Sequence, residues 1–257
     1  MEAYDKVIAA RAKGRPTAIA YINEIFDEFI EMHGDRRFGD DKAIIAGIAR
    51  LKDIPVTVIG IERGTDTKEK IIRNFGAVHP EGYRKALRQM KLAEKFGRPV
   101  ICFIDTSGAY CGIGAEERGQ GEAIAENIME MMTLKTPIIS VVIGEGGSGG
   151  ALALGVADEV WMLENAVYSV ISPEGCASIL WKDPDKTKFA AECLKLTADD
   201  LLKFGIIEKI IEEPEDNFTF VYNNLRADLY NTIKRSIART SHELIEKRYQ
   251  RFRKIGL

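Results

Sequence analysis

The stretch GEGGSGGALALG, residues 144–155, decides the fold because it joins a strand-like apolar run, PIISVVIG, to a helix-like run, ALALGVA. Five of the seven residues from 144 to 150 are glycine. Glycine adopts positive φ and lets a neighbouring chain or a ligand touch the peptide plane. The stretch therefore predicts a glycine-rich loop between strand and helix whose bare backbone is available for binding.

A dinucleotide site is the first hypothesis for this stretch. Gly144, Gly146 and Gly149 have the G-x-G-x-x-G spacing, and Glu164 lies where a ribose-binding acid is expected. The context argues against it, because the motif belongs to the third strand–helix unit of the chain instead of the first. Glu164 also follows EVWML inside a short hairpin-like segment.

A serine hydrolase is the second hypothesis. Gly146, Ser148 and Gly150 fit G-x-S-x-G, and a strand–turn–helix is the setting that a nucleophilic serine needs. The reaction also needs a histidine further along the chain. His242 is the sole histidine after Ser148, and its segment RTSHELIEKRYQ is typical of a charged surface helix.

The third hypothesis uses only the backbone. Free N–H groups at a helix start point outward and carry partial positive charge. Two such groups aimed at one point stabilise an oxyanion without a metal or a nucleophile. A tight turn that packs against a neighbouring segment is the structural alternative.

The composition is that of a globular chain. Of 257 residues, 46% are hydrophobic, enough for a substantial core in one large domain or two small ones. A net charge of −3 gives no reason to expect nucleic acid or an anionic membrane as a partner. No window approaches 18 uninterrupted apolar residues, so no membrane span is expected.

The cysteines and histidines argue against a metal site in this chain. The chain has four cysteines (Cys102, Cys111, Cys176 and Cys193) and three histidines (His33, His79 and His242), and no two cysteines form C-x-x-C. The first residues, MEAYDKVIAARAKGRP, lack the apolar core of a secretory signal. We therefore expect free thiols and a cytoplasmic location.

Outward from the glycine stretch, strands and helices alternate. Strands are predicted over 43–51, 54–62, 98–106, 136–144, 159–163, 166–173 and 206–214. Helices are predicted over 15–35, 80–96, 121–134, 151–157, 174–181, 197–205 and from 217 onward. This alternation predicts an α/β fold with mainly parallel strands and a ligand beyond their carboxyl ends. The basic end, KRYQRFRKIG, is expected to be a solvated last turn.

Several long segments resemble one family, the alpha subunits of the bacterial acetyl-coenzyme A carboxylase carboxyltransferase. They lie in order between residues 26 and 214: DDKAIIAGIARL, TKEKIIRNFGAVHPEGYRKALR, FIDTSGAYCGIGAEERGQGEAIAEN, VIGEGGSGGALALG and YSVISPEGCASILWK. The resemblance implies a crotonase-like fold of repeated β-β-α units with helical N- and C-terminal extensions. It implies a single carboxyltransferase domain over 1–257, with a core at about 35–214 and a helical segment at about 215–257.

The resemblance also implies a reaction and its partners. The family transfers a carboxyl group from carboxybiotin to acetyl-coenzyme A and forms malonyl-coenzyme A, the first committed step of fatty acid synthesis. The biotin is carried by a separate carrier protein, and biotin carboxylase belongs to the larger complex. The active site lies between alpha and beta chains, two of each, and the zinc is on beta, so no cofactor or metal is expected on this chain. Another acyl-coenzyme A as substrate stays open.

Matching the family's motif places oxyanion donors on the amides of Gly149 and Gly150, with no side-chain base. The expected substrate-binding residues are Gly146, Gly147, Gly108, Ala109, Tyr110, Phe75 and Gly76. Tyr110 is equally compatible with ordinary loop packing. A basic run is expected to be solvated or to touch a subunit, with coenzyme A phosphates as the alternative: Arg63, Lys68, Lys70 and Arg73.

This chain departs from the family's pattern at two places. Ser107 and Cys111 stand where many members have proline, which would stiffen the loop TSGAYCG. Many members also have a longer helical segment before the region that begins here near Arg15.

Overall fold

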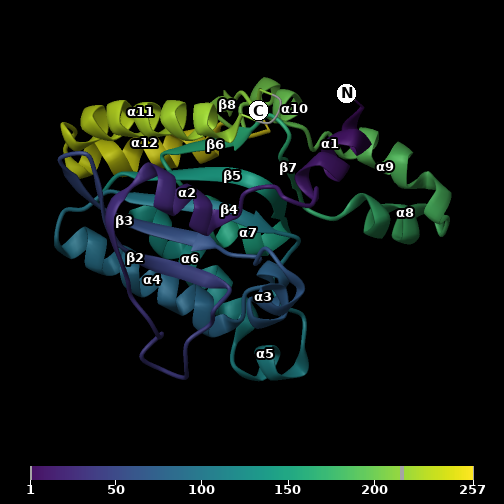
Figure 1. The fold of residues 1–257 in the computed structure, drawn as a ribbon, viewed down its shortest axis with the longest axis horizontal. Coiled ribbons are helices and arrows are strands. Elements are labelled where there is room, and N and C mark those ends of the chain that lie inside the picture. Colours follow the sequence, from purple (N-terminus) through teal and green to yellow (C-terminus); the bar gives the residue numbers. More distant parts are fainter. Residues whose placement is uncertain (1, 215–216, 257) are drawn as a thin grey trace.

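The computed structural model describes residues 2–214 and 217–256 and is organised around one mixed sheet (Figure 1). The strands run in the order β1-β2-β3-β4-β5-β6-β8, and β7 pairs with β5. Their bounds are β1 (Asp27–Glu31), β2 (Ile44–Leu51), β3 (Ile54–Ile61), β4 (Val100–Thr106), β5 (Ile138–Gly147), β6 (Glu159–Leu163), β7 (Val167–Ser169) and β8 (Lys209–Ile211).

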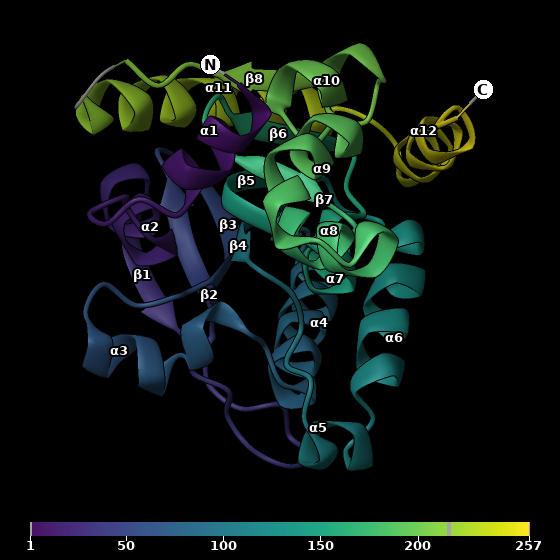
Figure 2. The same cartoon turned by 90° about the vertical axis from the view of Figure 1, so that its right-hand side faces the viewer.

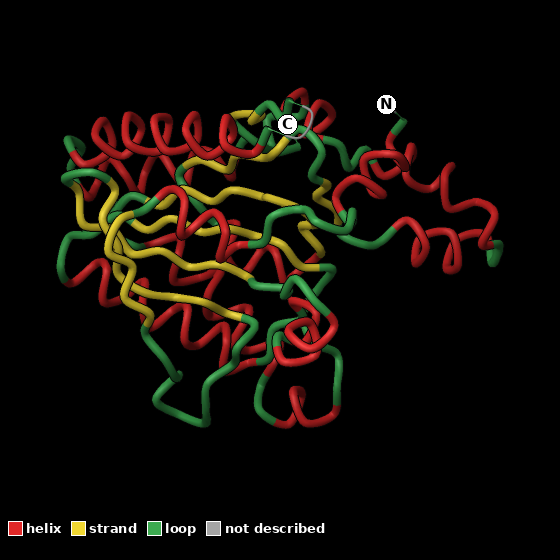
Figure 3. The backbone as a smooth tube through the Cα atoms, viewed as in Figure 1, coloured by secondary structure: helices red, strands yellow, loops and turns green. Residues whose placement is uncertain are grey.

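Helices cover both faces of this sheet (Figures 2 and 3). One face carries α4 (Pro80–Lys95), α6 (Gln120–Thr133) and α7 (Ser148–Gly155), with α12 (Ser241–Arg253) packed on α6. The other face carries α2 (Ala18–Ile25), and α11 (Phe218–Ile237) packs on α2. The remaining helices are α1 (Ala3–Ala10), α3 (Thr67–Ile72), α5 (Ile113–Glu117), α8 (Pro173–Trp181), α9 (Thr187–Leu194) and α10 (Ala198–Lys203).

The sheet topology brings several strand ends to one edge. β2 and β3 form an antiparallel hairpin, and β3, β4, β5, β6 and β8 are parallel neighbours. The long β5 pairs with β6 through its first half and with β7 through its last three residues, Glu145 to Gly147. The carboxyl ends of β3, β4 and β5 therefore meet, which is where parallel α/β sheets bind ligands.

Most elements that were predicted from the sequence are confirmed. The turn between the β2–β3 hairpin strands is two residues, with Lys52 at φ 57°. Helix α4 begins at Pro80, as expected for proline at the first helical position. Thr197 caps α10 by accepting the Asp200 N–H, and α11 begins after Asn217, which caps it in the same way.

The helix predicted over 15–35 is wrong in its second half. Helix α2 ends at Ile25, and Asp27–Glu31 form the edge strand β1, which pairs with β2 through a bulge. The prediction failed because the apolar residues of this segment suit a helical stripe as well as an edge strand. Glu28 has φ 55°, which a continuous helix does not allow.

The predicted hairpin of 159–163 and 166–173 is also wrong. β6 and β7 do not pair with each other, because each is a parallel neighbour of β5. The loop predicted over 145–150 is absent as well, since β5 extends to Gly147 and α7 begins at Ser148. The expected loop at 107–119 contains the short helix α5.

The basic C-terminal segment is not a solvated turn throughout. Arg248 of α12 is fully buried and binds Asp158 with both Nε and Nη2, at 3.0 Å each. Its guanidinium also donates to the carbonyl oxygens of Met131, Leu134 and Thr136. Because these groups belong to α6 and to the connections that lead into β5 and β6, Arg248 fixes α12 to the rest of the molecule.

This contact predicts a large loss of stability for Arg248→Met. Removing one partner of a buried ion pair leaves an uncompensated charge and costs about 3–5 kcal/mol. Urea denaturation should show this loss, whereas the control Arg253→Met, at an exposed position of the same helix, should stay within about 0.5 kcal/mol of the wild type. Equal effects of the two substitutions would contradict the anchoring role.

Candidate active site at the start of helix α7

The helix α7 begins directly at the end of strand β5. Ser148, its first residue, has φ 48°, so the chain turns from strand to helix within one peptide. Among the described residues, no side chain caps this end of the helix. The first N–H groups of a helix have no intrahelical acceptor, so those of Ser148, Gly149 and Gly150 are donors for another group.

The start of α7 lies against the loop that follows β4. A Cβ atom added at Gly147 would lie 2.2 Å from the carbonyl oxygen of Ser107. One added at Gly150 would lie 2.6 Å from the amide nitrogen of Ala109 and 2.9 Å from the carbonyl carbon of Gly108. Both glycines are therefore required by backbone contact, and we call residues 107–109 and 146–150 the glycine junction.

Within the glycine junction, Gly149 is the residue with free space beside it. A Cβ atom there would meet only the side chain of Ile124, at 3.7 Å. Gly146, in contrast, packs against the Tyr168 ring, 2.8 Å from its added Cβ position. The four predicted glycines of this stretch thus have two tasks: three permit close packing, and Gly149 leaves its side open.

The loop residues predicted to line the site lie at the same place. The Thr106 hydroxyl donates to the Gly108 carbonyl oxygen and accepts the Gly108 N–H, at 2.8 and 3.0 Å. This pair of bonds fixes the Gly108–Ala109 peptide, and the Ala109 nitrogen faces Gly150. Gly108 has φ 152°, a backbone conformation that residues with a side chain rarely adopt.

Tyr110, Phe75 and Gly76 are placed differently from one another. Tyr110 stacks on His79 with ring centroids 4.0 Å apart. Gly76 is buried, and its added Cβ would lie 2.9 Å from the Asp105 carbonyl oxygen. The loop between α3 and α4, which we call the first repeat's loop, therefore reaches this edge of the sheet. Phe75, at φ 54°, has an exposed side chain that points to solvent instead of packing in the glycine junction.

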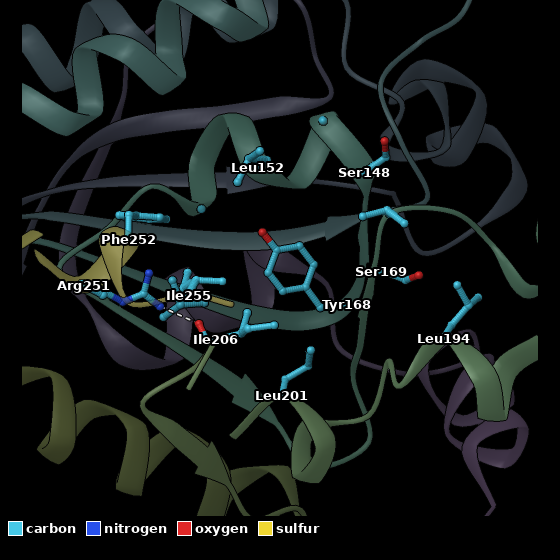
Figure 4. A pocket seen from close by; sticks show the side chains of 14 residues that line it. Ser148, Leu152, Tyr168, Ser169, Leu194, Leu201, Ile206, Arg251, Phe252 and Ile255 are labelled. Carbon is cyan, nitrogen blue, oxygen red and sulfur yellow. Dashed lines mark hydrogen bonds between the residues drawn. The ribbon is translucent and has the colours of Figure 1, made fainter. Parts of the chain in front are cut away.

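An apolar pocket of about 470 Å³ lies along α7, beside Gly149 (Figure 4). The pocket is lined from α7 by Ser148, Gly149 and Leu152. Tyr168 of β7 also lines it, with its hydroxyl group toward α7. The opposite wall comes from α10 and from the end of α12; it includes Leu201, Ile206, Arg251, Phe252 and Ile255. The sequence did not predict this pocket, because its walls come from segments about 100 residues apart.

A cluster of charged side chains lies under the glycine junction. Arg63 Nη1 is 2.9 Å from Glu145 Oε2 and 3.1 Å from Asp105 Oδ1, and Arg11 Nε is 2.7 Å from Glu145 Oε1. Asp105 Oδ1 also accepts the Glu145 N–H. Arg63 is therefore not solvated like the basic run that the sequence suggested, because its guanidinium binds two buried carboxylates. The sequence does not show this contact, because both carboxylates are far away in the chain.

The environment shifts the pKa values of this cluster. Burial favours neutral Arg63, but Asp105 and Glu145 more than offset it and raise the Arg63 pKa. Burial raises the pKa of Asp105, against the opposing effect of Arg63. A raised Arg63 pKa favours the charged ion pair, whereas a raised Asp105 pKa favours the neutral carboxyl group. We favour the ionised pair, because Asp105 also accepts a backbone N–H, which stabilises its charged form.

The two alternative hypotheses for the glycine stretch find no support in the geometry. Ser148 is exposed, and no histidine among the described residues hydrogen-bonds to it. His242 lies exposed at the start of α12, as expected. Glu164, the expected ribose-binding acid, accepts the Glu213 N–H and lies 3.6 Å from Lys6.

Comparisons with known proteins decide the family. The profile described as "Acetyl co-enzyme A carboxylase carboxyltransferase-like" matches residues 1–256. The carboxyl transferase subunit alpha of Ruminiclostridium cellulolyticum acetyl-coenzyme A carboxylase is 63% identical over 100% of this chain and 99% of that protein. The Shouchella clausii subunit is 57% identical over 100% of this chain and 80% of its own length.

The chain belongs to the acetyl-coenzyme A carboxylase carboxyltransferase alpha subunits. It is therefore a carboxyltransferase component and one subunit of a multi-subunit enzyme. The resemblance stated from the sequence is confirmed.

Solved structures confirm the fold of this alpha subunit. A transcarboxylase 12S structure with bound methylmalonyl-coenzyme A aligns with TM-score 0.69 and 18% identity, over 90% of this chain and 44% of that chain. The beta subunit of a Pseudomonas aeruginosa geranyl-CoA carboxylase gives 0.70 and 16%, over 94% and 46%. A Pseudomonas malonate decarboxylase hetero-tetramer gives 0.66 and 17%, over 82% and 86%.

The described part of this alpha subunit contains neither a cluster of metal ligands nor a membrane-spanning helix. Among residues 2–214 and 217–256, no group of three or more histidine, cysteine or acidic side chains is placed to hold a metal ion. In the same part of the chain, no helix has the length and apolarity needed to cross a bilayer.

The glycine junction predicts opposite effects for two similar substitutions. Gly149→Ala adds a methyl group to free space in a helix and should leave the free energy of unfolding unchanged or raise it by about 0.4–1 kcal/mol. Gly147→Ala forces the Ser107 carbonyl aside and should cost about 1–3 kcal/mol. Denaturant titration of both variants measures the difference. A Gly149→Ala variant as unstable as Gly147→Ala would refute this packing.

Proposed function

We propose that this alpha subunit binds carboxybiotin on a carrier protein and, with a beta subunit, transfers its carboxyl group to acetyl-coenzyme A. The product is malonyl-coenzyme A, which enters fatty acid synthesis. The observation that carries the proposal is the uncapped start of α7, where adjacent N–H donors lie beside open space at Gly149. The pocket along α7 leaves room for an apolar part of the ligand.

The chemistry requires donors at this point and little else. Carboxybiotin supplies an activated carboxyl group, whose release leaves negative charge on the ureido oxygen, and proton removal from the acetyl group leaves an enolate. Each is an oxyanion, and a preorganised donor to an oxyanion typically contributes about 3 kcal/mol. The ureido nitrogen is itself a base, so no side chain of this chain is assigned that task.

We assign the donor role to the amides of Gly149 and Gly150. The Ala109 amide nitrogen lies next to Gly150, so it belongs to the same group of polar backbone atoms. Gly146, Gly147 and Gly108 hold this group by close packing, and we place Tyr110 and Gly76 at its margin. The exposed Phe75 is assigned to the substrate-facing or subunit-facing side of the first repeat's loop.

A beta subunit is the partner that this surface suits. Helices α8 and α9 project from the body of the molecule (Figure 1). These helices and the segment before α8 carry exposed apolar side chains: Val170, at 78% exposure, with Ile179, Leu180 and Phe189. Several large apolar side chains exposed on one projecting segment suit a protein–protein contact. We propose an assembly of two alpha and two beta chains; a malonate decarboxylase with a similar fold is also a hetero-tetramer.

The rest of the complex follows from the same proposal. We place the zinc on the beta subunit, biotin on its carrier protein, and biotin carboxylase in the larger assembly. Residues 1–257 are taken as one carboxyltransferase domain, because the main core cluster runs from Ala18 to Ile233. A cytoplasmic location suits the four free cysteines. We assign the acyl pocket to the beta subunit, so this chain alone does not determine which acyl group the enzyme accepts.

The divided site predicts that this chain alone is inactive. The purified chain should show negligible decarboxylation of malonyl-coenzyme A with biocytin as acceptor, and addition of a matching beta subunit should restore it. Following the conversion of malonyl-coenzyme A to acetyl-coenzyme A and the carboxylation of biocytin together measures the reaction. Full activity of the isolated chain would contradict a site divided between two subunits.

Substitutions at Ser148 and Gly150 separate the oxyanion site from a nucleophilic serine. Ser148→Ala should keep much of the rate, whereas loss of a true nucleophile costs about 10⁶-fold. Gly150→Val should lower kcat by at least about 10²-fold, because the new side chain displaces Ala109 and turns the amide. Rates are compared for complexes of equal thermal stability. An inactive Ser148→Ala variant with a mild Gly150→Val variant would reopen the hydrolase hypothesis.

A further inference from the structure

Arg63 lies where three successive strands end. It follows β3 by two residues, and its Nη1 binds both Asp105 of β4 and Glu145 of β5, at 3.1 and 2.9 Å. Its Cγ lies 2.7 Å from the position that a Cβ of Gly76 would take, in the loop of the first repeat. A single side chain therefore connects the ends of β3, β4 and β5.

The two carboxylates lie on the two halves of the glycine junction. Glu145 is two residues before Gly147, and Asp105 is two residues before Ser107, whose carbonyl oxygen Gly147 contacts. The Glu145 N–H donates to Asp105 at 2.9 Å, so the two strand ends are already in register. A cation that binds both carboxylates therefore holds the two halves of the junction together.

We propose that Arg63 is a positioning residue for the carboxyl-transfer reaction: it sets the distance between the α7 amides and the Ser107–Ala109 loop. This inference rests on the proposed function of those amides. Arg63 acts through Glu145 and Asp105 and is not assigned a contact with the substrate.

The arrangement does more than balance charge, because it fixes the ends of β4 and β5 relative to each other. The cluster holds a second cation, Arg11, but this residue binds Glu145 and the exposed Glu174 and makes no ion pair with Asp105 in the described chain. Of the two arginines, only Arg63 spans β4 and β5. Displacement of a reacting or donor group by about 1 Å costs on the order of 10²-fold in rate, so a small shift of the junction is a measurable event.

The first test is Arg63→Met in the assembled complex with the beta subunit. With biocytin and malonyl-coenzyme A, we expect kcat to fall by about 10- to 100-fold and KM for biocytin to change less than about threefold, because donors are misplaced while the pocket persists. Arg63→Lys keeps the charge but has a shorter reach, so its kcat should lie between those of the wild type and Arg63→Met.

A double variant separates position from charge balance. Arg63→Met leaves Asp105 without its cation, whereas Arg63→Met/Asp105→Asn removes one charge of each sign and keeps an Oδ1 acceptor for the Glu145 N–H. We expect the double variant to recover most of the lost Tm and little of the lost kcat. A purely structural ion pair predicts recovery of both.

Arg15→Met is the matched control. Arg15 is also a largely buried arginine beside β5, where it donates to the Ile143 carbonyl oxygen and pairs with Glu213, so its partners are neither junction residues nor the two carboxylates that Arg63 binds. Its loss should lower Tm and leave kcat within about twofold. The proposal is overturned if Arg63→Met keeps a wild-type kcat, if the double variant recovers kcat with Tm, or if Arg15→Met loses as much kcat. An inactive wild-type complex would instead refute the proposed function.

Discussion

The close approach of two backbones, Gly147 against the Ser107 carbonyl and Gly150 against the Gly108–Ala109 peptide, is the constraint on which this structure depends. A side chain at either glycine would separate β5–α7 from the loop after β4. The separation would move the start of α7, whose N–H groups are the proposed donors of the site. Packing and chemistry therefore make the same demand on the same residues, and a glycine kept for one purpose cannot be exchanged without loss of the other.

Such an approach leaves little room for side chains within the junction, and the charged cluster below supplies the support instead. Asp105 and Glu145 lie on the strands that lead into the two halves of the junction, and Arg63 binds both. Buried charges contribute little to stability when compared with apolar groups of the same shape, because their desolvation is costly. Here the ion pairs act as a geometric constraint, because a short contact with both carboxylates fixes the distance between two strand ends.

The sequence predicted what depends on local pattern. The β2–β3 hairpin, the strand β4 and the helix α4 follow from alternation, apolar runs and Pro80, and the structure confirms them. Edge strand β1 was missed because its apolar residues also fit a helical stripe. The roles of Arg63 and Arg248 were missed because their partners, such as Glu145 and Asp158, are about 80–90 residues away, and charge sign alone does not identify them.

The same long-range dependence explains why the family resemblance led to a more specific site hypothesis than either motif did. G-x-G-x-x-G and G-x-S-x-G both fit the stretch, since each describes only glycine spacing. The observations that favour the proposed oxyanion site lie outside the motif: Thr106 orients the Gly108–Ala109 peptide, and no histidine of the described chain bonds to Ser148. Glycine spacing indicates that two backbone segments approach closely. What chemistry is possible there depends on the second segment, residues 107–109, which the motif does not describe.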